Sequence, residues 1–164
     1  MNDSVFDILD DSPDDIIWEA VTPAGYHLFQ VNEEELIYLD DNAAVEFHHI
    51  VARLLCLCKR VRPDLQTDVA FLCTIVQKPD TEDYKKLSSA LKYLRTTASL
   101  PFILGMDDTN TVSCWVDGAF AIYNYMRIHT GAYMSLGIGA AYASSSKQKN
   151  KCAQFYQSRA RSCR

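Results

Sequence analysis

The sequence predicts an α+β fold in which three amphipathic helices are followed by a three-stranded antiparallel sheet. Apolar residues recur at three- and four-residue steps across residues 42–97, which is the period of helices with one buried face. From Thr111 onwards, apolar and polar residues alternate in short runs bounded by glycines, which is typical of half-buried strands. The 164 residues, 48% of them hydrophobic, can form one domain or two small ones.

The first predicted helix runs from about Asn42 to Val61. Asp41 or Asn42 is expected to cap its N-terminus, because a short oxygen-bearing side chain can accept a hydrogen bond from an unpaired amide of the first turn. Arg60 falls in the last turn, where a cation offsets the partial negative charge of the helix end. The apolar stripe consists of Phe47, Ile50, Val51, Leu54, Leu57 and Val61.

Two further helices are predicted after this one. Pro63 suits the opening of the second, since a proline at the first helical position lacks only an amide that would be unpaired there. Asp80 is expected to cap the third, with Asp83 at its third helical position completing a capping box. Their apolar stripes are Leu65, Val69, Leu72 and Val76 in the second helix, and Tyr84, Leu87, Leu91 and Leu94 in the third.

Three strands are predicted at 111–119, 129–136 and 140–146. Gly137-Ile138-Gly139 is expected to form a tight hairpin turn between the last two, because both glycines can adopt positive φ. The segment from Lys147 onwards lacks periodicity, so no packed structure is expected there. The sequence thus divides into an arm and connector (1–41), a helical region (42–97), a partial sheet (98–149) and a basic, disordered tail (150–164).

Charge is distributed unevenly along the chain. Residues 1–52 hold 13 of the 21 acidic residues and neither lysine nor arginine, whereas residues 53–164 carry 16 basic and 8 acidic residues. The first 41 residues are therefore predicted to form an acidic, weakly ordered arm. The basic remainder fits either a surface for a polyanion such as nucleic acid or scattered solvated charges. Charge alone favours the second interpretation.

The chain is expected to be intracellular, in the cytoplasm or nucleus, and not secreted. No apolar run approaches the ~18 residues of a membrane-spanning helix, and the acidic first residues do not fit a signal peptide. The six cysteines are then expected to be reduced thiols. Cys56 and Cys73 are predicted to lie in the core as small apolar residues.

Two segments contain carboxylates that resemble metal-binding motifs. Tyr38-Leu-Asp-Asp41 has the Y-x-D-D form of a polymerase metal hairpin, but no second apolar strand follows it, so helix capping is the favoured interpretation. Asp117 stands near the predicted end of the first strand, where a carboxylate can bind a divalent cation. The alternative for Asp117 and Gly118 is an ordinary Asp-Gly turn, and the residues alone favour the turn.

The order of several segments resembles the region that follows the polymerase core in copia-type LTR retrotransposon Pol polyproteins. The resemblance covers about 105 to 128 residues, and it lies in the order and spacing of the segments rather than in any single motif. The segments are Phe47-His-His-Ile-Val-Ala-Arg-Leu-Leu55, Lys59-Arg-Val-Arg-Pro-Asp64, Ala70-Phe-Leu-Cys73, Lys85-Lys-Leu87, Leu91-Lys-Tyr-Leu-Arg95, Trp115-Val-Asp117, Met126-Arg127, His129-Thr-Gly131, Met134-Ser-Leu-Gly137 and Ser144-Ser-Ser-Lys-Gln-Lys149.

The resemblance implies a fold and a parent chemistry. Residues 42–97 would correspond to the helical connection and residues 109–149 to the first strands, the N-terminal part of an RNase H-like fold. Asp117 would be the first-strand metal ligand. The parent activity is hydrolysis of the RNA strand of an RNA–DNA hybrid, in which two Mg²⁺ ions activate water and stabilise the leaving oxygen.

The chain also departs from the family's pattern. The only Y-x-D-D lies 76 residues before Asp117 on flanks that do not fit the polymerase, and residues 150–164, where the family has a helix carrying a catalytic glutamate, contain no acid. We interpret residues 150–164 as a frameshifted reading of that helix, which the nucleotide sequence can test. Asp117 is therefore expected to be a vestigial ligand in a non-catalytic remnant that binds no Mg²⁺ stably.

Three hypotheses about partners follow. The remnant is expected to bind an RNA–DNA hybrid or other nucleic acid weakly and in a salt-sensitive manner. The basic residues expected to make these contacts are Arg60, Arg62, Lys85, Lys86 and Lys92. Alternatively, the chain is an interaction module that dimerises, or binds another Pol fragment, through exposed helix and sheet edges. A third hypothesis is a nuclease that another chain completes in trans.

Overall fold

The computed structural model describes residues 3–10, 20–25, 28–31, 36–107, 111–123 and 127–151. The chain divides into two compact units, residues 1–100 and 101–164. Helices form the first unit and strands the second, so the predicted α+β fold class is confirmed. The predicted 150–164 tail lies outside the described residues, apart from its first two positions.

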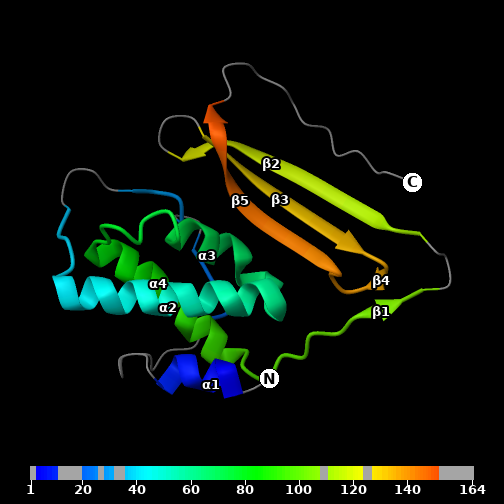
Figure 1. The fold of residues 1–164 in the computed structure, drawn as a ribbon, viewed down its shortest axis with the longest axis horizontal. Coiled ribbons are helices and arrows are strands. Elements are labelled where there is room, and N and C mark those ends of the chain that lie inside the picture. The colour runs from blue at the N-terminus through cyan, green and yellow to red at the C-terminus, as the bar shows by residue number, and fades with distance from the viewer. Residues whose placement is uncertain are drawn as a thin grey trace. The chain divides into compact units, whose positions relative to one another are not determined.

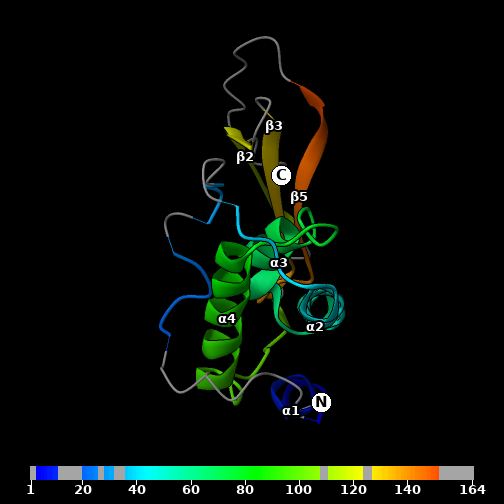
Figure 2. The same ribbon diagram turned by 90° about the vertical axis from the view of Figure 1, so that its left-hand side faces the viewer.

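The helical unit contains four α-helices and one short 3₁₀ helix among its described residues. They are α1 (Asp3–Asp10), α2 (Asp41–Arg60), the 3₁₀ helix η1 (Pro63–Leu65), α3 (Gln66–Leu72) and α4 (Thr81–Thr96). The view along α2 in Figure 2 shows α4 running across it, with α1 alongside α2. Nine of the most deeply buried apolar side chains belong to the three predicted stripes: Phe47, Val51, Leu54, Leu65, Val69, Leu72, Leu87, Leu91 and Leu94. Phe71 and Cys58 are buried to the same extent but lie outside those stripes.

Part of the arm predicted at residues 1–41 forms a helix, α1. Val5 and Ile8, three residues apart on one face of this helix, are buried in the core beside α2. Arg53 of α2 fixes the helix further by donating a 2.7 Å hydrogen bond from Nη2 to the carbonyl oxygen of Asp7. The burial of Val5 and Ile8, the partial burial of Leu9 and this hydrogen bond hold the short helix against α2, despite the acidic residues in it.

The helix caps follow the predicted chemistry, with one shift. Asp40, rather than Asp41 or Asn42, caps α2 and accepts a 3.2 Å hydrogen bond from the Ala43 amide. The capping box of α4 is present as predicted: the Asp83 amide donates to Asp80 Oδ1 at 2.8 Å, and the Asp80 amide donates to Asp83 Oδ2 at 3.3 Å. Capping, and not a strand hairpin, is thus the local role of the Y-x-D-D segment.

The second predicted helix is shorter than its apolar stripe. α3 ends at Leu72, and residues 73–78 form turns in which Ile75 donates to the Leu72 carbonyl and Lys78 to the Ile75 carbonyl. Val76, the last member of the stripe, is only partly buried against the core. Among the cysteines of α2, Cys58 is buried and Cys56 is exposed, so the prediction of a buried Cys56 is wrong. Burial raises the pKa of Cys58 to about 11.

The second unit is built around a three-stranded antiparallel sheet. Its strands are β2 (Ser113–Tyr123), β3 (Arg127–Ser135) and β5 (Tyr142–Lys151), in the order β2-β3-β5 (Figure 1). β5 is longer than predicted, because its pairing with β3 continues beyond Ser146 to Lys151. The expectation that no regular structure follows Lys147 is therefore wrong for residues 147–151.

The connection between β3 and β5 is longer than a tight hairpin turn. Its middle, β4 (Gly137–Ile138), pairs antiparallel with β1 (Gly105–Met106). Gly137 has φ 146° and Gly139 has φ 77°, so both glycines adopt positive φ as predicted. A Cβ at Gly139 would also lie 2.1 Å from the Ile103 carbonyl oxygen, so only glycine fits where the two segments meet.

No helix among the described residues combines the length and the apolar character that crossing a lipid bilayer requires.

Candidate functional site

Asp117 lies within a strand and not in a turn. It is paired with Gly131 of β3 in the ladder of β2, and its neighbour Gly118 is paired with Thr130. The Asp-Gly turn interpretation is therefore wrong. The carboxylate is exposed, and its Oδ1 accepts a 2.8 Å hydrogen bond from the Gly118 amide. Asp117 is thus accessible on the sheet surface, inside the strand rather than at its end.

Asp117 belongs to a row of three residues across the sheet. Gly131 is the register partner of both Asp117 on β2 and Ser145 on β5. Partners in adjacent strands project from the same face of a sheet. A Cβ added to Gly131 would meet nothing within 4 Å. The face is therefore open above Gly131, with a carboxylate on one side and a hydroxyl on the other.

A buried histidine adjoins this row. His129 is joined to Tyr123 by a 2.7 Å hydrogen bond at Nδ1 and to Ser145 by a 2.5 Å hydrogen bond at Nε2. Burial lowers the pKa of His129 and raises that of Tyr123 to about 12. The imidazole therefore favours its neutral form at pH 7. The three side chains come from three different strands and link the sheet through polar contacts.

A bulge in β2 brings Tyr123 to this position. The register passes from Ala119 opposite His129 to Tyr123 opposite Arg127, so three residues of β2 face one residue of β3. Within the bulge Ala121 has φ 56°, a left-handed conformation that alanine adopts only at an energetic cost. Bulges re-aim side chains, and this one returns Tyr123 to the face that carries His129.

Two cations lie at the same end of the sheet. The ammonium of Lys147 lies 4.5 Å from the centre of the Tyr123 ring. Burial, with a contribution from the charge of Arg127, lowers the pKa of Lys147. Arg127 Nε is buried and has no hydrogen-bond partner in the part of the chain that the structure describes. The sequence patterns did not indicate this cluster, because only the strand register brings its members together.

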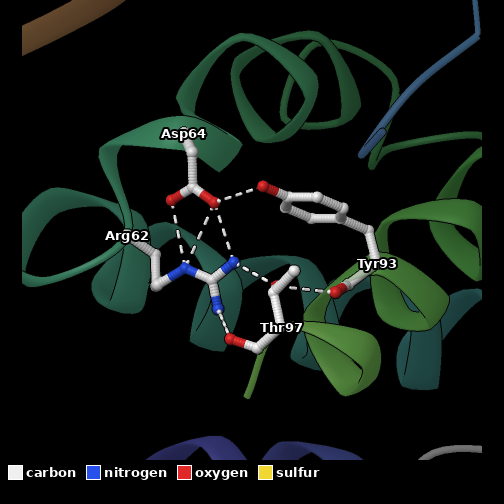
Figure 3. A network of polar contacts seen from close by, with 4 residues as sticks. All are labelled: Arg62, Asp64, Tyr93 and Thr97. Atoms are coloured by element: carbon white, nitrogen blue, oxygen red, sulfur yellow. Dashed lines mark hydrogen bonds and ion pairs between the residues drawn. The ribbon is translucent and has the colours of Figure 1, made fainter. Parts of the chain in front are cut away.

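Arg62 is a structural residue and not a surface cation. It is 4% exposed, and its Nε and Nη2 donate to the Asp64 carboxylate at 3.0 and 2.7 Å (Figure 3). It also donates from Nη1 to the Thr97 carbonyl oxygen at 3.1 Å and from Nη2 to Thr97 Oγ1 at 2.6 Å. Tyr93 donates to Asp64 Oδ2 at 3.0 Å.

This network sets the charge of Asp64. Burial would raise the pKa of the Asp64 carboxyl, but the hydrogen bonds and charge of Arg62, together with the Tyr93 hydroxyl, lower it below its usual value. Asp64 is thereby held as a carboxylate that ties the start of η1 to the last turn of α4. A role for Arg62 in binding nucleic acid is incompatible with this burial.

The other predicted nucleic-acid contacts do not form one basic patch. Lys86 is largely buried: its Nζ donates to the Gln30 carbonyl oxygen at 2.9 Å and to Asp83 at 3.3 Å. Lys85 is exposed but pairs with Glu82 at 2.5 Å on the same helix. Arg60 is exposed at the end of α2, and Lys92 is half-buried on α4. Two of the five residues, Arg62 and Lys86, therefore have buried structural roles. The other three, Arg60, Lys85 and Lys92, remain at least partly exposed.

An unexpected feature of the helical unit is the buried carboxyl of Asp68. It is 1% exposed, and neither oxygen has a hydrogen-bond partner among the described residues. Burial raises its pKa to about 8, although the charge of Lys86 acts in the opposite direction. Asp68 borders a cavity of about 100 Å³ that is also lined by Ala24, Gly25, Leu28, Glu82, Lys85, Lys86 and Ser89.

The described residues do not fit a pair of Mg²⁺ ions. They contain no group of three or more histidine, cysteine, aspartate or glutamate side chains that could hold a metal ion. The neighbours of Asp117 in its row are a glycine and a serine, whereas two-metal chemistry needs several carboxylates around ions about 4 Å apart. Comparison of the chain with protein-family models, curated proteins and solved structures gave no match.

Proposed function

We propose that this chain is a remnant of a copia-type retrotransposon Pol polyprotein that does not catalyse hydrolysis on its own. It would contain the connection helices and the opening sheet of an RNase H domain. The parent activity would be cleavage of the RNA strand in RNA–DNA hybrids. This proposal starts from the order of the sequence segments described above.

The observation that carries the proposal is the position of Asp117 in the sheet. The resemblance places the family's first metal ligand on the first strand of an antiparallel three-stranded sheet. Asp117 lies on β2, which is the first strand of the β2-β3-β5 sheet, and its carboxylate is exposed. The sheet order and the accessible carboxylate agree with that assignment.

The absence of catalysis is argued from composition and geometry. Residues 101–164 contain three acids, Asp107, Asp108 and Asp117. Asp107 follows β1, and its amide donates to the Leu136 carbonyl, away from the row of Asp117. Asp108 lies outside the described residues. A single carboxylate cannot hold the two ions of the parent mechanism.

The genomic DNA around the coding sequence tests the ancestry. We expect a polymerase-coding frame upstream and, in a shifted frame after Lys149, a helix that carries a glutamate. A flanking sequence without either would contradict the proposal.

Catalysis is tested separately with the purified chain, an RNA–DNA hybrid and Mg²⁺. We expect no cleavage by the native chain or by Asp117→Asn. Cleavage that is abolished by Asp117→Asn would refute the non-catalytic assignment and would favour a site completed in another way, including in trans.

Weak nucleic-acid binding is a further part of the proposal. Because Arg62 and Lys86 are engaged inside the helical unit, the contacts fall to Arg60, Lys85 and Lys92. Filter binding at low and high salt should show sequence-independent binding that decreases steeply with salt. Lack of binding at low salt would remove this part of the proposal and leave the ancestry untouched.

A second candidate function is supported by the exposed apolar side chains of the sheet. Trp115 and Val116 are each 52% exposed, and Tyr142 is 53% exposed. Consecutive residues of a strand point to opposite faces, so β2 carries exposed apolar side chains on both faces. β2 is also an edge strand, with one unpaired side in the described sheet. Such edges pair readily with a second copy.

Sedimentation of the purified chain distinguishes this second candidate. A dimerising module should shift from monomer to dimer as concentration increases, and Trp115→Lys should oppose the shift. A monodisperse monomer at all accessible concentrations would exclude the dimer.

A further inference from the structure

We propose that Arg127 and Lys147 form a binding site for a phosphate group at one end of the β2-β3-β5 sheet. The proposal does not depend on the Pol ancestry, because it rests on the positions of these side chains in the sheet. The ligand chemistry is a tetrahedral oxyanion, either free or within a nucleic-acid backbone.

The first argument is uncompensated positive charge. The two side chains are close enough for the charge of Arg127 to act on Lys147. The backbone register places Lys147 opposite His129, two residues from Arg127 along β3. No ion pair joins Arg127 or Lys147 to a carboxylate in the described parts of the chain. An anion at this end would remove the repulsion.

The sequence supplies few acids that could act as an internal counter-ion. Residues 101–164 contain seven basic residues and three acidic ones. Asp117, the acid on this sheet, lies on β2, which is separated from β5 by β3. The two strand spacings separate these backbone positions by about 10 Å, and no ion pair joins Asp117 to Lys147 among the described residues. The neighbouring residues 124–126 contain no acid.

The second argument is the unpartnered donor. Arg127 Nε is buried and lacks an acceptor among the described residues. A buried unpaired donor is costly, and more so when it is charged. The guanidinium presents Nε and a terminal nitrogen as a planar fork that matches two oxygens of a phosphate. Binding one phosphate would satisfy this donor and neutralise part of the charge at once.

The surroundings favour an anion over a cation or an apolar ligand. Lys147 is held over the face of the Tyr123 ring, which restricts its ammonium to this end of the sheet. Tyr123 and Ser145 are fixed by their hydrogen bonds to His129. The site thus combines two positioned cations with polar neighbours that are already ordered, and the side chains over the buried Arg127 Nε must move aside to admit the anion.

The test uses the full-length ¹⁵N-labelled chain and the NMR signals of arginine Nε–H groups. Inorganic phosphate is titrated against sodium chloride at equal ionic strength. We expect the Arg127 signal to move saturably with phosphate and not with chloride, while the Arg95 signal stays in place. Lys147→Gln should weaken phosphate binding at least fivefold. Lys59→Gln, which removes one exposed cation of α2, should leave it unchanged.

A second titration distinguishes the two sources of phosphate. It uses a short single-stranded oligothymidylate without terminal phosphates. Movement of the Arg127 signal with both ligands supports a site that accepts backbone phosphodiesters, whereas movement with inorganic phosphate alone supports a site for free phosphate or a monoester. Absence of saturable movement with either ligand overturns the proposal. The titrations of the native chain decide the matter even if a variant fails to fold.

Discussion

Replacement of Asp68 by asparagine should stabilise the helical unit at alkaline pH. In the folded chain the carboxyl is buried without a hydrogen-bond partner among the described residues, and its pKa is raised to about 8. In the unfolded chain its pKa returns to the ordinary value of 3.8. Folding between these two pH values therefore requires Asp68 to take up a proton, and asparagine, which has nearly the same shape, has no such requirement.

The sign and size follow from proton linkage. Between about pH 4 and pH 8 the folded state binds one proton more than the unfolded state, so the contribution of Asp68 to stability falls as pH rises. Each pH unit in this window corresponds to about 1.4 kcal/mol. The full window sets an upper limit of roughly 6 kcal/mol, which relaxation and water entering the adjoining cavity will reduce. We expect the free energy of unfolding of Asp68→Asn to exceed that of the native chain by about 2 kcal/mol or more at pH 8, and by much less at pH 5.

Urea unfolding followed by the far-ultraviolet circular dichroism of the helices measures this difference at pH 5, 6, 7 and 8. Asp64→Asn is the matched control with the opposite sign: it should be less stable than the native chain by a constant amount from pH 5 to pH 8. Because the folded-state pKa of Asp64 is lowered, its contribution is present above about pH 4 and is lost as pH falls through the folded value. If the stabilities of Asp68→Asn and the native chain ran parallel across the four pH values, the account of a buried neutral carboxyl would be refuted.

Three further predictions test the packing. Arg62→Met should destabilise the helical unit by about 3 kcal/mol, since it leaves the partly buried Asp64 carboxylate without its partner, and urea unfolding measures the loss. Gly139→Ala should destabilise the sheet unit by more than about 2 kcal/mol, because its Cβ would overlap a carbonyl oxygen at a positive φ, whereas Gly131→Ala should be nearly neutral. Thermal unfolding followed by tryptophan fluorescence compares the two, and equal losses would contradict the reasoning. Ala121→Gly should raise stability by about 1 kcal/mol in the same assay by relieving the φ of 56°, and a loss would show that the strain is absent.

The helical unit could be predicted largely from sequence, because burial there follows the periodicity of the chain. The stripe that begins at Phe47 became the buried face of α2, and the Asp80–Asp83 capping box formed as expected. Periodicity failed where tertiary contacts decide the outcome. Helix α1 has only two buried aliphatic residues amid several acids, and its stability depends on packing against α2, which no local pattern encodes.

The candidate sites could not be predicted, because strand register creates them. The hydrogen bond between His129 and Ser145 joins residues 16 positions apart. The contact of Lys147 with Tyr123 depends in addition on a bulge whose central alanine gives no sequence signal. The burial of two of the five predicted basic contacts could not be predicted for a related reason. Arg62 and Lys86 have the same charge as solvent-exposed cations, but their aliphatic stems and partners draw them into the core.

The exposed aromatic side chains of the sheet would stabilise it further if a second layer of protein packed over them. Trp115 and Tyr133 lie in register on one face, with ring centres 5.3 Å apart, and each keeps a large exposed area. Burial of apolar surface contributes about 25 cal/mol per Å², so an added layer over this pair would stabilise the sheet. If that layer is a second copy of the chain, the unfolding temperature of the sheet unit must rise with protein concentration. An unfolding temperature that is independent of concentration would exclude a second copy of the chain as that layer.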